Sequence, residues 1–331
     1  MKKVLILALI LTVGFSFMGV TTASAKILRI GHLQTNDHPH AIGVAEFAKL
    51  VKQKTNGSIE VKIFGNSQLG NAMTQIQSVK MGTLESFIDG AGWFGQLVGD
   101  YYIFSTPYLM KAPVLDYTVA VAKSDIGKEI NKKLLDQQGI RMIDLTWLRL
   151  PRQALSRKPI RNLDDVQKIK MRVPELTSFI EGWKALGAAP TPVNFSEIYL
   201  ALQQGVIDAC ELDVNMIYTQ KLHEVAKYLS LTYHQAEPCA MIMNEQFFKG
   251  LTPKEQQAIM EAAVEAGAVN DKGIRDSEQM IFKQMKASGV TFIEIDQNAF
   301  RAKVKDLPYQ FEARGLWTKG LYDRIQKVTL K

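Results

Sequence analysis

Two kinds of apolar pattern alternate along the first part of the chain. Short apolar runs at residues 27–31, 59–64 and 84–88 are typical of strands. Between them, residues 41–55 and 70–80 carry apolar side chains at helical spacing. Strands and helices that alternate in this way predict an α/β fold with mostly parallel sheets.

The same order of elements recurs later in the chain. One predicted helix ends at Gly82, where glycine can adopt the left-handed conformation, and the strand that follows leads to Asp89. A second helix starts at Asn194 with a capping-box pattern and ends at Gly205, and the strand 206–212 leads to Asp213. The recurrence predicts two similarly built lobes. Ligands bind beyond the carboxyl ends of strands in open α/β sheets, so we expect Asp89 and Asp213 on opposite walls of a cleft.

A single long helix is predicted over residues 252–288, starting at Thr252 with Pro253 and Glu255 in its first turn. At about 1.5 Å per residue it would extend roughly 50 Å, long enough to cross both lobes. No Gly/Ser-rich linker separates the halves, so several short crossings are expected. We expect residues 26–149 with 238–277 in the first lobe, and residues 150–237 with 278–331 in the second.

The N-terminus has the order of a cleavable secretory signal. Lys2 and Lys3 precede an uncharged, almost wholly apolar stretch over residues 4–20, and small residues follow up to Ala25. The alternative is a membrane anchor, but the apolar stretch is shorter than the ~20 residues that a span needs. We therefore expect residues 1–25 to be removed. The mature protein should start at Lys26 in the periplasm, without stable membrane insertion.

The number and distribution of charged residues limit the kinds of molecule that the protein is expected to bind. The formal net charge of +7 includes Lys2 and Lys3, and the remaining basic residues are scattered rather than clustered. This distribution argues against nucleic-acid binding and suits a protein that captures small anions.

The cysteine and histidine residues do not indicate a catalytic or metal-binding site. Cys210 and Cys239 could form a disulfide in an oxidising compartment, but both lie in apolar, strand-like segments and buried free thiols are favoured. His32, His38 and His40 could approach a metal ion. Without accompanying cysteine or acidic ligands, however, a polar loop at the mouth of the cleft is the preferred interpretation. No hydrolase, nucleotide-binding or dinucleotide-binding motif occurs, and neither a catalytic residue, a metal nor a cofactor is predicted.

Three segments resemble the solute-binding proteins of tripartite ATP-independent periplasmic (TRAP) transporters, which include receptors for C4-dicarboxylates and sialic acid. They are GNSQLG at residues 65–70, KMRVP at 170–174 and PTPVNFSEIYLALQQGVID at 190–208. Lys168 stands where the family pattern before the second segment has glycine. The resemblance extends over essentially the whole mature chain. It implies two α/β lobes, with a long C-terminal bridging helix, that close on one small organic acid.

The resemblance also implies site residues. Arg172 matches the arginine that pairs with the ligand carboxylate, a task suited to the planar, permanently charged guanidinium. Arg152 matches a second arginine that faces the ligand, and Phe195 an aromatic ring that packs on it. We add Asp89, Gly90, Trp93, Leu212 and Asp213 from the predicted ends of strands.

Leu212 departs from the family, in which many members have an asparagine that helps hold the carboxylate. Trp93, Trp147, Phe195 and Leu212 could give the pocket apolar walls. Buried hydroxyls without partners are costly, so the ligand expected is a monocarboxylate with substantial apolar surface rather than a sugar acid. Asp89 and Asp213 could reach a hydroxyl or amino group at its other end.

The resulting prediction is a monomeric receptor that delivers its ligand to the membrane permease of a TRAP transporter. Two alternatives remain open from the sequence. One is an exported enzyme acting on a small acid, and the other is a subunit that delivers ligand to a membrane sensor.

Overall fold

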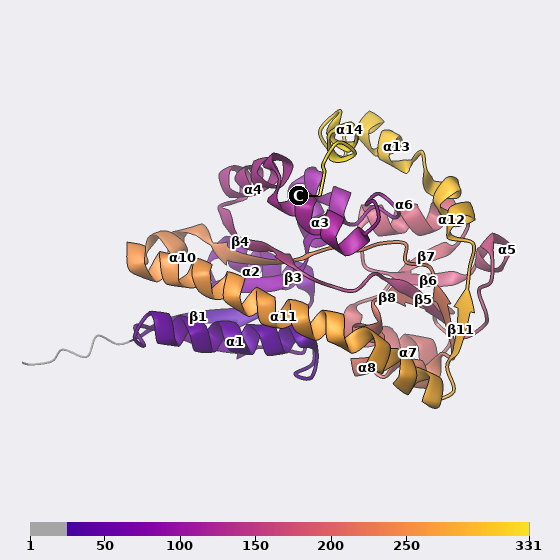
Figure 1. Ribbon diagram of the computed structural model, residues 1–331, viewed down its shortest axis with the longest axis horizontal. Coiled ribbons are helices and arrows are strands. Elements are labelled where there is room, and N and C mark those ends of the chain that lie inside the picture. The colour runs from indigo at the N-terminus through magenta and orange to yellow at the C-terminus, as the bar shows by residue number, and fades with distance from the viewer. Residues whose placement is uncertain (1–24, 331) are drawn as a thin grey trace, which may run out of the picture.

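The computed structural model describes residues 25–330 and has two lobes, each built on its own sheet (Figure 1). We call the part built on the first sheet lobe I and the part built on the second sheet lobe II. In spatial order, the sheet of lobe I contains β2 (Ile59–Phe64), β1 (Lys26–Gly31), β3 (Ser86–Gly90), β10 (Cys239–Asn244) and β4 (Ile140–Trp147). The sheet of lobe II contains β11 (Thr291–Glu294), β9 (Tyr228–Leu231), β5 (Gln153–Ser156), β8 (Ala209–Leu212), β6 (Lys170–Val173) and β7 (Ala189–Pro192). The predicted two-lobed α/β fold is confirmed.

Both sheets are mixed rather than mostly parallel. β10 is antiparallel to β3 and β4, and β5 is antiparallel to β8 and β9, whereas the other pairings that involve β1, β6 and β11 are parallel. The reason is topological: the chain enters β5 from lobe I and β10 from lobe II. Each of these strands arrives from the opposite lobe and so runs against its neighbours.

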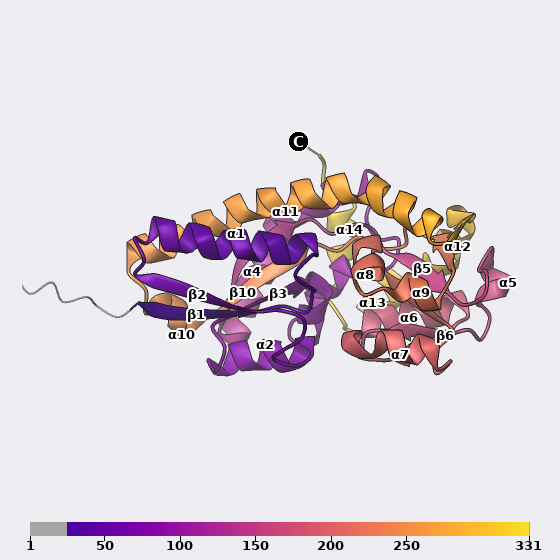
Figure 2. The same ribbon diagram turned by 90° about the horizontal axis from the view of Figure 1, so that it is seen from below.

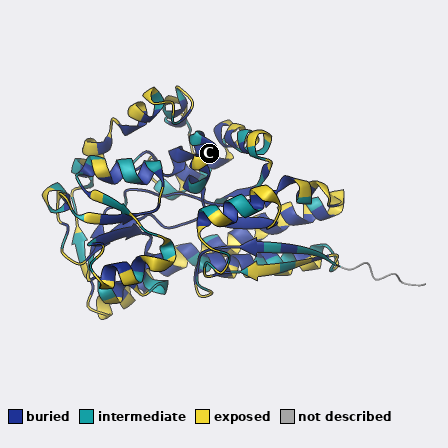
Figure 3. Ribbon diagram, turned by 180° about the vertical axis from the view of Figure 1, so that it is seen from behind, coloured by how far each residue is buried: buried dark blue, intermediate teal, exposed yellow. Residues whose placement is uncertain are grey.

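Helices cover the faces of both sheets. In lobe I they are α1 (Pro39–Lys54), α2 (Ala72–Met81), the 3₁₀ turns η1 (Ala91–Gln96) and η2 (Gly99–Phe104), α3 (Val114–Lys123), α4 (Asp125–Gln138) and α10 (Glu245–Lys249). In lobe II they are α5 (Leu163–Val166), α6 (Thr177–Leu186), the 3₁₀ turn η3 (Phe195–Glu197), α7 (Ile198–Gln203), α8 (Val214–Thr219) and α9 (Leu222–Val225). The inner strands of both sheets are largely buried, whereas exposed positions lie on the outer faces of the helices and on the edge strands β2, β7 and β11 (Figure 3).

The long helix α11 (Pro253–Ala287) spans both lobes (Figure 2). It packs on α1 and β4 of lobe I and then on α8 of lobe II. Its start is the predicted capping box, in which the Thr252 side chain and Glu255 each accept a backbone N–H of the other. The predicted capping box at Asn194 differs, because the Asn194 side chain donates to the Glu197 carboxylate instead of capping the backbone.

The C-terminal segment returns from lobe II to lobe I. It contains α12 (Gln297–Val304), α13 (Leu307–Ala313) and α14 (Leu321–Ile325). α12 packs on α6, and the end of the segment lies against α3 and α4, where the Tyr117 hydroxyl donates to the carbonyl oxygen of Ile325. The chain therefore passes between the lobes several times.

Between residues 25 and 330, no helix combines the length and the apolar character needed to cross a membrane. The predicted signal peptide lies outside the described residues.

Candidate functional site

A cleft of about 580 Å³ opens where the two lobes meet. Lobe I contributes the start of α2 and the turn η1, and lobe II contributes the end of β6 and the segment from β7 into α7. A smaller cavity of about 30 Å³ lies on its inner side. The two spaces share part of their lining: Leu33, Trp93, Arg172, Pro174 and Phe195.

Arg172 lines both spaces and has no carboxylate partner among the described residues. Strand alternation on β6 turns it away from Met171 and Val173, and its Nε donates to the carbonyl oxygen of Val193 at 2.9 Å. The residue is only 3% exposed, yet its guanidinium forms no ion pair with any residue in the described part of the chain. Burial lowers the pKa of Arg172 to about 10, so the group stays charged at neutral pH. The terminal nitrogens of its guanidinium remain available to an anion in the cleft.

Arg152, by contrast, already has a carboxylate partner. Its Nε and Nη2 lie 2.5 and 2.9 Å from the two carboxylate oxygens of Glu211, which projects from β8. Burial alone would raise the pKa of Glu211. The charge of Arg152 and hydrogen bonds from His234 and Arg152 outweigh that effect, so the pKa lies below its ordinary value. Arg152 also lines the inner cavity, but the carboxylate of Glu211 largely neutralises its charge.

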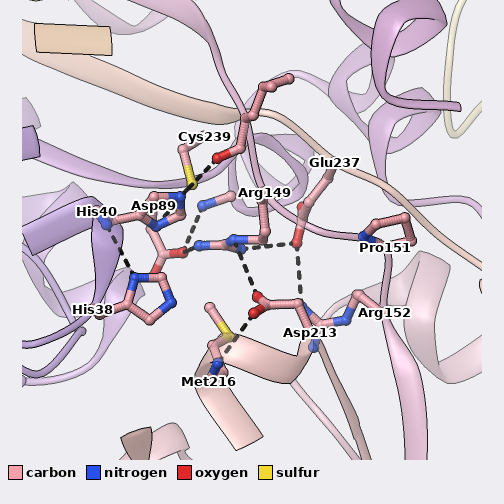
Figure 4. A network of polar contacts seen from close by, with 12 residues as sticks. His38, His40, Asp89, Arg149, Pro151, Arg152, Asp213, Met216, Glu237 and Cys239 are labelled. Atoms are coloured by element: carbon pink, nitrogen blue, oxygen red, sulfur yellow. Dashed lines mark hydrogen bonds and ion pairs between the residues drawn. The ribbon is translucent and has the colours of Figure 1, made fainter. Parts of the chain in front are cut away.

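A third arginine, Arg149, links the two lobes (Figure 4). It lies on the first crossing segment, between β4 and β5. Its guanidinium lies 2.5 Å from Asp89 of β3, 3.2 Å from Glu237 on the second crossing and 3.8 Å from Asp213 at the start of α8. All four side chains are almost completely buried. Burial raises the pKa of Glu237 and of Asp213, while the nearby arginines oppose the shift.

The other predicted site residues fall into two groups. Trp93 and Phe195 line both spaces, and Asp89 and Leu212 line the inner cavity. Gly90 and Asp213 line neither of them. Gly90 packs so closely against Glu237 and Arg149 that a Cβ atom would come within 2.7 Å of both side chains. Asp213 accepts the Met216 N–H as the cap of α8.

Two expectations for neighbouring residues are wrong. His32, His38 and His40 are buried rather than at the cleft mouth, because their segment folds inward between β1 and α1. Trp147 is a core residue, held between α1 and α11 with its Nε1 donating to the carbonyl oxygen of Ala263. No group of potential metal ligands occurs among residues 25–330.

Arg149 and Glu237 were not singled out from the sequence, although the structure makes them central to the site. They lie 88 residues apart on two irregular crossings, where no helical or strand period marks a position as buried. The sequence feature that could have identified Arg149 is a charged residue between two apolar ones, Leu148 and Leu150, in a segment that connects the lobes.

The comparisons with known proteins agree on one family. Residues 30–314 match the model of bacterial extracellular solute-binding proteins of family 7. A solute-binding protein of Roseobacter denitrificans is 30% identical, with 86% of each chain covered. The 2,3-diketo-L-gulonate-binding periplasmic protein of Escherichia coli is also 30% identical, with 87% of each chain covered.

Solved structures show the same fold. A TRAP periplasmic solute-binding protein from Fusobacterium, with bound sn-glycerol-3-phosphate, matches with a TM-score of 0.87 and 27% identity, over 92% of this chain and 96% of that one. One from Roseobacter denitrificans, with bound L-galactonate, matches with a TM-score of 0.83 and 28% identity, over 92% and 99%. The chain therefore belongs to the bacterial extracellular solute-binding proteins of family 7, the solute-binding proteins of TRAP transporters.

Proposed function

We propose that this protein binds a small organic acid in the cleft between its lobes and delivers it to the membrane permease of a TRAP transporter. The observation that carries the proposal is the state of Arg172: a buried, charged guanidinium that faces the cleft without a carboxylate of the protein. A buried charge without a partner is costly, and the carboxylate of a ligand is the partner that this site lacks.

The geometry suits capture by closure. A carboxylate can accept two parallel N–H bonds from the guanidinium, which fixes its orientation as well as its position. Arg172 lies on lobe II, whereas Trp93 and Leu33 of the same cavity lie on lobe I. A ligand that touches both walls favours the closed form, and closure excludes water and strengthens the ion pair. The closed form is then the one that the permease recognises.

The compartment and the mode of action follow from this role. Relatives named above are periplasmic binding proteins, and we infer the same location for this chain after removal of residues 1–25. We infer binding without chemical conversion, by a monomer. Ligand recovered after prolonged incubation should be unchanged by NMR, and the protein should elute as a monomer in size-exclusion chromatography.

Calorimetric titration of Arg172 variants tests the proposal. A thermal-shift screen of the mature protein against organic acids identifies a ligand, because a compound that binds only the folded state raises the melting temperature. Arg172→Ala should then weaken binding by about 2–5 kcal/mol, and Arg172→Lys should restore it only in part, because an ammonium group lacks the planar fork. Arg161→Ala, at an exposed arginine that pairs with Asp165, is the control. A loss of affinity below about tenfold for Arg172→Ala would count against the assignment.

A further inference from the structure

A buried glutamine at the inner end of the cleft has an amide without a partner. Gln34 follows β1, is 2% exposed and lines the inner cavity together with Arg172. Neither its Nε2 nor its Oε1 has a hydrogen-bond partner between residues 25 and 330. Proteins rarely leave both ends of a buried amide unpaired, because each unmade bond retains its full desolvation cost. The partner of this amide must come from outside the protein, as an ordered water molecule or as a polar group of a ligand.

Asp89 places a carboxylate beside the same cavity. Its Oδ1 accepts from the N–H of Gly90 and from Arg149. No hydrogen bond to its second oxygen, Oδ2, is found within the described chain. The inner end of the cavity therefore offers one strong acceptor, together with an amide that can both donate and accept.

The charges around the inner cavity disfavour a second anion there. Four carboxylates surround three arginines: Asp89, Glu211, Asp213 and Glu237 against Arg149, Arg152 and Arg172. A ligand carboxylate paired with Arg172 adds one more negative charge. A second carboxylate at the other end would meet Asp89 and would be repelled.

We propose that Gln34 and Asp89 form a specificity subsite that binds a hydroxyl group of the acid held by Arg172. A hydroxyl donates to the Asp89 carboxylate and accepts from Gln34 Nε2, so it gives each side chain a partner without adding charge. An ammonium group could donate to Asp89 and to Gln34 Oε1, but it would leave Gln34 Nε2 without an acceptor and would place a second positive charge beside Arg149. The receptor then selects hydroxylated monocarboxylic acids over unsubstituted acids, amino acids and dicarboxylates. This preference differs from the largely apolar acid expected from Leu212, because that expectation did not include the unpaired amide of Gln34. This inference rests on the proposed function, because it takes Arg172 as the site of the carboxylate.

Matched acids test the selectivity in the wild-type protein. The probes are D-erythronate, butyrate, 2-aminobutyrate and succinate, and in parallel L-galactonate, hexanoate and adipate, each titrated calorimetrically into the mature chain. In at least one set, the hydroxylated monocarboxylate should bind at least tenfold tighter than its partners, because a site built for a hydroxyl group rejects analogues that leave its polar groups unpaired. The inference is overturned if neither hydroxylated acid binds, or if an unsubstituted acid, an amino acid or a dicarboxylate binds as tightly.

Gln34→Met tests the subsite, because it keeps the length of the side chain and removes both hydrogen-bonding groups. Affinity for the hydroxylated acid should fall about tenfold, and affinity for the unsubstituted acid should stay unchanged. The melting temperature without ligand should stay level or rise, because an unpaired buried amide has been removed. If Gln34→Met does not fold, Gln34→Asn withdraws the amide with a smaller change, and it should reduce the same preference.

Gln75→Met is the matched control. Gln75 is also a buried glutamine with an unpartnered Oε1, but its Nε2 donates to the carbonyl oxygen of Gly70 and it lines neither space. Its replacement should leave the preference for the hydroxylated acid intact. Equal loss of preference in both variants would overturn the inference. If acids bind through Arg172 but Gln34→Met leaves the preference unchanged, the proposed subsite is refuted and the proposed function stands. If Arg172→Ala leaves binding intact, the proposed function fails.

Discussion

Arg152 and Glu211 form a two-pronged ion pair inside lobe II, with the Nε and Nη2 atoms of the arginine 2.5 and 2.9 Å from the two carboxylate oxygens. Arg172 lies close enough for Glu211 to influence its pKa, yet its only hydrogen bond in the described structure goes to a backbone carbonyl. These two arginines of the inner cavity therefore differ in whether their charge is neutralised by a carboxylate of the protein. One is neutralised by the fold, and the other is left for a ligand.

This difference predicts opposite effects of the same substitution on unliganded stability. Arg152→Leu leaves the buried carboxylate of Glu211 without its main partner and should lower the free energy of unfolding by about 3–5 kcal/mol. Arg172→Leu removes a buried charge that has no carboxylate, and it should leave that free energy unchanged or raise it. Urea denaturation of both variants without ligand measures the two changes. Equal destabilisation would show that Arg172 has a structural partner after all.

A second prediction concerns acid stability. Burial raises the pKa of Glu255, but hydrogen bonds from Lys26, Thr252 and Ser58 outweigh it and bring the pKa to about 2. Because the folded-state pKa is below the unfolded value, this stabilisation is present above about pH 4.5 and is lost as the pH falls towards 2. Its size should be about 1–2 kcal/mol, since Lys26 is partly exposed and solvent screens the pair.

The measurement is the free energy of unfolding between pH 5 and pH 2 for the wild type and Glu255→Gln. The variant should be less stable at pH 5, and its stability should fall less steeply below pH 4.5. Glu46→Gln is a suitable control, because Glu46 forms an exposed pair with Lys49 at the surface. Parallel pH profiles for the wild type and Glu255→Gln would contradict the prediction.

A third prediction concerns the backbone at Lys168. This residue has a φ of 60°, in the left-handed region that favours glycine, and it stands where the family pattern has glycine. Lys168→Gly should therefore stabilise the protein by up to about 1 kcal/mol. Lys184→Gly, inside the helix α6, should destabilise it by about 1 kcal/mol. Thermal melting of the two variants should give shifts of opposite sign, and a lowered melting temperature for Lys168→Gly would refute this reading of the turn.

The cysteines give a fourth prediction. Cys210 lies on β8 and Cys239 on β10, in different lobes, and both are free and fully buried. Burial raises the pKa of Cys210 to about 12 and that of Cys239 well above its ordinary value, so neither forms a thiolate at neutral pH. A thiol reagent such as Ellman's should react with neither cysteine in the native protein and with both in denaturant without reductant. Fewer than two reactive thiols in denaturant would indicate a disulfide.

Local patterns account for most of what the sequence predicts correctly. The glycine stops at Gly82 and Gly205 both have positive φ angles, of 75° and 74°, and the capping box at Thr252 is formed as expected. Each of these features depends on residues within one turn of the chain. The α/β order depends on apolar periodicity in the same local way, so the fold class follows from the sequence.

The features that the sequence does not predict depend on contacts between distant segments. Arg149 meets Asp89 and Glu237 only because the two crossings lie side by side, and the burial of His38 depends on how its loop folds back. The mixed sheets have the same origin: strand direction in β5 and β10 is set by the lobe from which the chain arrives. Local periodicity carries no information about that path.

The position of β10 also fixes the order in which the molecule can be completed. β10 lies between β3 and β4, and its residues 239–244 follow β3 by about 150 positions and β4 by about 90. A chain that emerges amino terminus first, from a ribosome or from an export pore, therefore presents β3 and β4 with unpaired edges until most of its length has appeared. The pairing of β10 with β3 and β4 closes long loops, and it therefore carries a larger entropic cost than pairing between strands that are close in the sequence. The sheet of lobe I is therefore completed only when β10 takes its place between β3 and β4.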